Sequence, residues 1–218
     1  MYAAITTLTL DPTGPAAGDI PALLRDLVGR TCPAAFAAGM LDTTVLHLPP
    51  DRIVMIAIYD AEAGALAMSS TVEQTITSQF ADTLRWEDRV VGLLFNSMLP
   101  DDSALTWRTE ARVLHATWAT WRVHPHLRSD KALLQFVEWG REQFEPLLHE
   151  LGQLDVLVIR SAEDKMAVLN LYPEPLKGQA GYQQVVAKVA DFTAGNLDLV
   201  EIQTGQAFDL AMLLARTS

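Results

Sequence analysis

Two nine-residue stretches decide the fold of this chain. Residues 51–59 read DRIVMIAIY and residues 164–172 read DKMAVLNLY, so the second copy lies 113 positions after the first (164 against 51). Each stretch begins with a polar pair, continues with bulky apolar residues and ends in tyrosine, a pattern typical of a buried β-strand.

The same offset aligns other parts of the chain. It pairs the first apolar run near the N-terminus with the run around Trp118, and it pairs the helical stripe Val72 and Ile76 with Val185 and Val189. It also pairs Gly39, Leu41 and Asp42 with Gly152, Leu154 and Asp155. One shift that aligns several separate elements indicates an internal duplication.

The second copy predicts the order βαββαβ. Bulky and small residues alternate over 116–123, and Ser129 or Asp130 can cap a helix that ends at Gly152 and contains Pro146. The polar turn 161–164 joins strands at 154–159 and 166–172 into a hairpin, followed by a helix over 182–192 and a strand over 197–203.

The first copy predicts the same order. Strands are expected at 2–10, 43–48, 53–59 and 90–96, and helices at 20–38 and 61–80, with Pro33 breaking or shortening the first helix. The predicted boundaries are residues 1–98 for the first repeat, 99–111 for a linker and 112–218 for the second repeat. A βαββαβ unit leaves one apolar sheet face uncovered, and the tandem copy can cover it. The fold class is therefore α+β.

Composition limits the function. Half of the 218 residues are apolar, and the net charge is −11, which opposes nucleic acid and anionic membranes as partners. The single cysteine, Cys32, can form no internal disulfide and leaves no thiolate cluster for a metal. The first residues lack the basic and apolar regions of a signal peptide, and we expect a cytoplasmic protein.

Short motifs near the strand starts and ends carry a resemblance. Residues 39–42 (GMLD) and 152–155 (GQLD) precede the second strand of each repeat, and Tyr59 ends the third strand before the helix start at 60–63 (DAEA). In these features the chain resembles the ferredoxin-like dimeric α/β-barrel superfamily, and within it the antibiotic-biosynthesis-monooxygenase-like proteins. The resemblance implies two ferredoxin-like βαββαβ repeats that form an intramolecular dimeric α/β-barrel.

The resemblance also implies two alternative functions. One is a cofactor-free, monooxygenase-like oxidoreductase that acts on, or binds, a small apolar or aromatic compound in the second repeat. The other is a non-catalytic ligand-binding or stress-related barrel. Haem-degrading members add an asparagine in the first strand and a histidine after the third, whereas this chain has Ala4 or Ile5 and Thr117 or Trp118, and no histidine beyond His149. No cofactor is therefore expected.

The candidate ligand-binding residues lie in the second repeat, which is richer in tryptophan and histidine. Asn170 is the one polar residue within an apolar strand, and a buried amide needs a hydrogen-bond partner. Alternation in the strand places Trp118 and Trp121 on opposite faces, one toward the helices. All the aromatic candidates could equally be core side chains. The candidates are Trp118, Trp121, Trp139, His149, Asn170 and Tyr172.

No metal site is expected. His124 and His126 flank Pro125 in a turn, and no nearby carboxylate or cysteine completes a ligand set, so both are interpreted as solvated loop histidines. The sequence leaves open the ligand, the existence of any catalysis, a pocket in the first repeat, and whether the fused barrel forms homo-oligomers.

Overall fold

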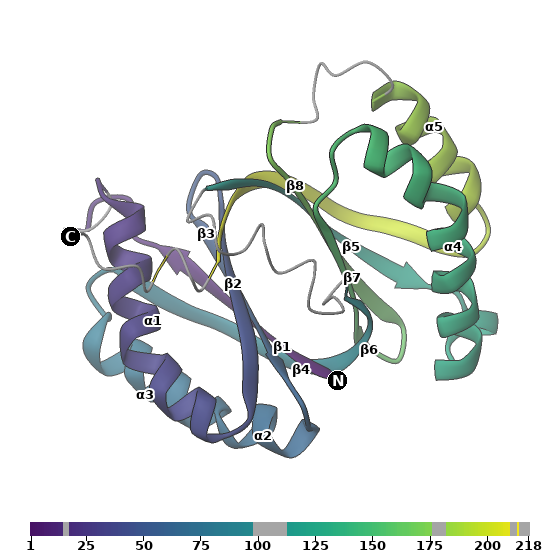
Figure 1. Ribbon diagram of the computed structural model, residues 1–218. Helices are drawn as coiled ribbons and strands as arrows, with labels where there is room; N and C mark the ends of the chain where they lie inside the picture. The colour runs from purple at the N-terminus through teal and green to yellow at the C-terminus, as the bar shows by residue number, and fades with distance from the viewer. Residues whose placement is uncertain (15–17, 98–112, 176–181, 210–212, 214–218) are drawn as a thin grey trace. The chain divides into compact units, whose positions relative to one another are not determined.

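The computed structural model confirms two βαββαβ repeats (Figure 1). It describes residues 1–14, 18–97, 113–175, 182–209 and 213. The first repeat contains β1 (Tyr2–Leu10), α1 (Ile20–Ala37), β2 (Met40–Leu48), β3 (Arg52–Tyr59), α2 (Glu62–Ala67), α3 (Ser69–Gln79) and β4 (Leu84–Ser97). The second contains β5 (Leu114–Val123), the 3-10 turn η2 (Pro125–Leu127), α4 (Asp130–Glu150), β6 (Asp155–Ala162), β7 (Lys165–Tyr172), α5 (Tyr182–Thr193) and β8 (Leu197–Asp209).

The chain forms two compact units that share their last strands. In the first unit the hydrogen-bonded strand order is β4-β1-β3-β2, followed by the end of β8 from Gly205 onward. In the second unit the order is β8-β5-β7-β6, followed by the end of β4 from Leu94 onward. The linker predicted at 99–111 lies outside the described residues.

The repeated stretches form the central strands. β3 pairs antiparallel with both β1 and β2, and β7 pairs antiparallel with both β5 and β6. A central strand whose residues are buried on both faces has an almost continuously apolar sequence. Every residue of β3 from Ile53 to Tyr59 is buried.

Helices cover one face of the first-unit sheet. Alternate residues of β1 and β3, including Leu8 and Ile53, form a core with Leu24 and Leu27 of α1 and Ile76 of α3, and all five are fully buried. The helix face that the spacing predicts is therefore the face that packs on the sheet.

Pro33 does not break the first helix, contrary to the prediction. α1 runs through it to Ala37. The proline removes the hydrogen bond to the carbonyl of Gly29, but both residues are exposed, so water can reach that carbonyl. The buried side chains on either side, such as Val28 and Cys32, hold the helix on the sheet.

The larger differences from prediction lie at three other places. The single helix expected over 61–80 is divided at Met68 into α2 and α3. β4 begins at Leu84 rather than 90. A register shift opposite Thr7 and Leu8 interrupts the alternation of its first residues, so the sequence pattern did not indicate a strand there. β8 continues to Asp209 rather than 203 and pairs with β2 from Gln206.

In the second unit, aromatic rings join the two helices. Phe192 of α5 lies against Phe136 and Trp139 of α4, with ring centroids 4.5 and 4.7 Å apart. A Cβ at Gly140 would lie 2.9 Å from the Phe192 ring, so this glycine allows the ring to contact α4. No helix in the described ranges is both long and apolar enough to cross a membrane.

The pairing of β8 with β2 depends on a close approach at Gly205. A Cβ there would lie 2.1 Å from the carbonyl oxygen of His47. We expect Gly205→Ala to lower the free energy of unfolding by about 2 kcal/mol or more, since backbone must move. Gly29→Ala is the control, because nothing lies within 4 Å of its Cβ and alanine favours helix by about 0.5–1 kcal/mol. Denaturant unfolding measures both; equal effects would contradict the close approach.

Burial raises the pKa of the Cys32 thiol to about 11, against a reference value of 9.0. A raised pKa in the folded state contributes stability below pH 9, and this contribution is lost as the pH rises through 11. We expect wild-type protein to lose about 2 kcal/mol more unfolding free energy between pH 8 and 11 than Cys32→Ala does. The variant isolates one group because the chain has no other cysteine. Parallel curves for the two proteins would refute the assignment.

Candidate functional site

The strand register sorts the predicted residues by sheet face. Thr117 pairs with Asn170 and His115 with Tyr172, so these side chains project from the same face as Met166 and Val168. Met166 and Val168 pack with residues of α4 and α5 in the core between sheet and helices, together with Trp121. Trp121, Asn170 and Tyr172 therefore share the helix-facing side, as alternation predicts.

Three other predicted residues are not brought to this face. Trp118 pairs with Leu169, projects from the opposite face and is 3% exposed, and its buried indole N–H has no hydrogen-bond partner among the described residues. Trp139 is half-exposed, and its ring contacts are with Phe136 and Phe192. His149 is exposed on the last turn of α4.

The hydrogen-bond partner of Asn170 is not among the residues predicted from the sequence. Gln153 is buried, and its Nε2 donates to Asn170 Oδ1 at 2.7 Å. The local turn positions it: Gly152 has a φ of 74°, its N–H donates to the carbonyl of His149, and the Gln153 N–H donates to the carbonyl of Leu148. These two hydrogen bonds together form the Schellman motif, which requires a residue in the left-handed conformation after the helix and so favours glycine.

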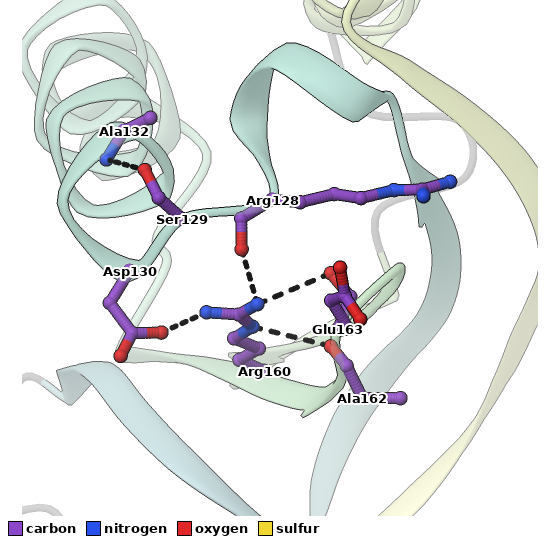
Figure 2. A network of polar contacts seen from close by, with 7 residues as sticks. All are labelled: Arg128, Ser129, Asp130, Ala132, Arg160, Ala162 and Glu163. Carbon is purple, nitrogen blue, oxygen red and sulfur yellow. Dashed lines mark hydrogen bonds and ion pairs between the residues drawn. The ribbon is translucent and has the colours of Figure 1, made fainter.

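The other end of α4 is fixed by Arg160 of β6. Its Nη1 forms an ion pair with Asp130, and its Nη2 donates to the carbonyl of Arg128, in the turn before the helix (Figure 2). Its Nε also donates to the carbonyl of Ala162 at 3.3 Å, within its own hairpin. The Ser129 hydroxyl caps the helix by accepting from the Ala132 N–H. Arg160 thus ties the start of α4 to the β6–β7 hairpin.

The helix-facing side of the second sheet is partly open to solvent. Thr117, Trp121 and Asn170 are each partly exposed although helices lie over this face. Their counterparts in the first repeat, at the 113-residue offset, are Ala4, Leu8 and Ala57, and all three are buried. Val156 and Val168 are likewise partly exposed where Thr43 and Met55 are buried.

This difference defines the candidate site. We call Thr117, Trp121, Val156, Val168 and Asn170, with Gln153, the second-repeat face. Its side chains are apolar or neutral hydrogen-bonding groups, the usual composition of a small-molecule site. Sequence reasoning missed Thr117, Val156, Val168 and Gln153 because which apolar positions stay open depends on where α4 and α5 lie.

The loop histidines have partners around the start of β8, one in the preceding turn and one in the strand. His124 Nε2 lies 3.1 Å from Asp198 Oδ1, and His126 Nε2 lies 3.0 Å from Asn196 Oδ1. Within the described part of the chain, no three His, Cys, Asp or Glu side chains gather closely enough to hold a metal ion.

Comparison with solved structures identifies the fold. The structure of a "putative monooxygenase" from Fusobacterium nucleatum matches with a TM-score of 0.58 at 10% identity, over 96% of this chain and 92% of that one. Chlorite dismutase from Candidatus Nitrospira defluvii matches with a TM-score of 0.57 at 11% identity, over 98% and 93%. The chain has the fused dimeric α/β-barrel fold.

An anthrone oxidase-like protein shares this dimeric α/β-barrel fold, with a TM-score of 0.51 at 13% identity over 100% and 97% of the two chains. No protein-family model matches the sequence, and no curated protein matches it. At these identities the likeness establishes the fold and confirms the predicted class.

The Gln153–Asn170 pair can be tested by installing the residues of the first repeat. Asn170→Ala leaves the buried Gln153 amide without its acceptor, and we expect a loss of about 1–3 kcal/mol in unfolding free energy. Adding Gln153→Met reproduces the Met40 and Ala57 combination of the first repeat and should recover much of that loss. Denaturant unfolding of both single variants and the double variant gives the coupling; strictly additive effects would show that the pair does not act as a unit.

Proposed function

We propose that the chain is a cofactor-free, monooxygenase-like oxidoreductase that takes a small apolar aromatic compound at the second-repeat face. The observation that supports this proposal is that Trp121 and Asn170 are partly exposed, whereas the equivalent residues of the first repeat, Leu8 and Ala57, are buried by their own helices. The ring of Trp121 offers a surface on which an aromatic ligand can stack. The Gln153–Asn170 pair offers neutral hydrogen-bonding groups held in one orientation.

The chemistry suited to such a face is oxidation of an activated methylene by dioxygen. In an anthrone, a CH₂ between two aromatic rings becomes C=O, and the two hydrogens leave with the second oxygen atom as water. The substrate supplies the electrons and dioxygen is the oxidant. The protein is left with binding, orientation and exclusion of water, and well-oriented binding alone can lower a barrier by several kcal/mol.

A specific feature of the face favours the non-catalytic alternative. The five strand residues are neutral, and none accepts a proton readily near pH 7. A face of this kind can bind a ligand without helping to deprotonate it. The same face would then serve as a plain ligand-binding site, and only turnover distinguishes the two functions.

The test is a thermal-shift screen with anthrones, quinols and haem, followed by oxygen consumption with each compound that binds. We expect an anthrone or quinol to raise the melting temperature, because a ligand that binds only the native state stabilises it. Trp121→Leu and Asn170→Ala, which install the first-repeat residues, should each reduce the shift by at least half. Trp139→Leu is the matched control, since this tryptophan lies in the contact between α4 and α5.

Each outcome has a meaning. Binding with oxygen uptake supports the oxidoreductase, whereas binding without uptake supports the non-catalytic alternative. The absence of a shift with any compound would overturn both, and so would a shift that Trp139→Leu reduces as much as Trp121→Leu does.

A further inference from the structure

A histidine lies next to the second-repeat face but is not part of it. His115 of β5 lies opposite Tyr172 of β7, and the next residues on the same side of the sheet, Thr117 and Asn170, lie opposite each other. His115 and Asn170 are therefore diagonal neighbours on adjacent strands, with Cα atoms about 7–8 Å apart. At this separation a single ligand atom or ring can contact both side chains.

The imidazole of His115 is accessible and has no competing partner. The residue is partly exposed, and neither ring nitrogen is buried. In the described part of the chain, no hydrogen bond, ion pair or ring contact joins His115 to another residue. His124 and His126, in contrast, lie against Asp198 and Asn196. The ring of His115 can therefore exchange a proton with a ligand that enters from solvent.

The amide of Asn170 presents a hydrogen-bond donor beside this imidazole. Its Oδ1 accepts from Gln153 Nε2 at 2.7 Å, which leaves its Nδ2 for another partner. That Nδ2 is not buried, and among the described residues it has no acceptor. The buried Gln153 thus holds the amide in the orientation that offers its N–H groups to a ligand oxygen.

This combination is specific to the second repeat. At the 113-residue offset, His115 has the counterpart Tyr2, which lies opposite Tyr59, and Asn170 has the counterpart Ala57. A proton acceptor and an amide donor therefore replace a tyrosine and a methyl group. They do so in the repeat whose helix-facing side is partly open to solvent.

We propose that His115 is the catalytic base for oxidation on the second-repeat face, and that the Asn170 amide donates to the oxyanion that forms. This inference rests on the proposed function, and it supplies the proton acceptor that the five strand residues lack. Histidine is the side chain that most often performs such a transfer. A donor held where negative charge develops stabilises the transition state.

The reaction uses one anthrone and one dioxygen. His115 removes a proton from the CH₂ group, the C–H electron pair moves into the ring system, and the carbonyl oxygen becomes an enolate that accepts from Asn170 Nδ2. Dioxygen oxidises the enolate and forms a C–O bond at the same carbon, and the imidazolium returns its proton to the peroxide. Loss of the second C–H proton, with cleavage of the O–O bond, then gives C=O and water.

The test separates proton removal from oxidation. Anthrone is incubated with the full chain in D₂O without dioxygen, and mass spectrometry follows the exchange of its CH₂ hydrogens for deuterium. We expect the wild type to accelerate exchange over the rate without protein. His115→Gln should reduce this acceleration by about 100-fold or more, because a general base contributes about 10²–10⁴-fold. The dissociation constant of anthrone should stay unchanged.

Two further variants assign the effect to the imidazole. His126→Gln is the matched control, because this histidine lies in the exposed turn against Asn196 and should exchange anthrone as the wild type does. His115→Ala leaves space for free imidazole, and added imidazole should restore part of its exchange rate. A histidine with a purely structural role predicts no response to imidazole.

The outcomes distinguish this inference from the proposed function. Equal exchange by the wild type and His115→Gln would overturn the role of His115, and oxygen uptake with anthrone would then still support the oxidoreductase. Binding of anthrone without faster exchange would likewise overturn the base. The absence of anthrone binding would overturn both proposals. If His115→Gln does not fold, His115→Tyr, which installs the first-repeat residue, carries the same comparison.

Discussion

The structure depends on the antiparallel pairing of each central strand with two neighbours. β3 and β7 are hydrogen-bonded on both sides, and their register decides which side chains face the helices. A shift of one residue would move Asn170 from the helix-facing side to the opposite face and bring Leu169 in its place. The apolar runs at 51–59 and 164–172 therefore specify more than burial, because their register also determines the sheet face from which a polar side chain such as Asn170 projects.

Helix α4, which lies over this sheet, is attached to the β6–β7 hairpin at both of its ends. Arg160 holds its first turn to the β6–β7 hairpin, and the Schellman turn at Gly152 brings Gln153 onto Asn170 at its other end. A helix attached at both ends to one hairpin cannot settle onto the middle of the sheet as freely as α1 does. Trp121 is partly exposed although it lies in the same row as Met166 and Arg160, at the end of the sheet where Arg160 holds the helix.

Local patterns made the architecture predictable. The repeat, the order βαββαβ and the opposite faces of Trp118 and Trp121 all follow from periodicity along the chain. The composition of the site did not follow in the same way. Trp139 and His149 have the right residue types for a ligand site, but their place on α4 puts one in the contact with α5 and the other in solvent. The hydrogen bond from Arg89 Nη1 to the Thr6 hydroxyl joins residues 83 positions apart, on two strands that no local pattern connects.

Fusion of two repeats in one chain explains why their helix-facing sides differ. Two identical subunits must carry the same residue at equivalent positions, whereas covalently joined copies can diverge independently. The second repeat has a neutral amide pair, Gln153 and Asn170, where the first has Met40 and Ala57. The first repeat has Thr6 holding a cation where the second has Ala119. The same backbone ladder thus carries a neutral amide pair in one repeat and an arginine held by a threonine in the other, so the two helix-facing sides have diverged in chemistry.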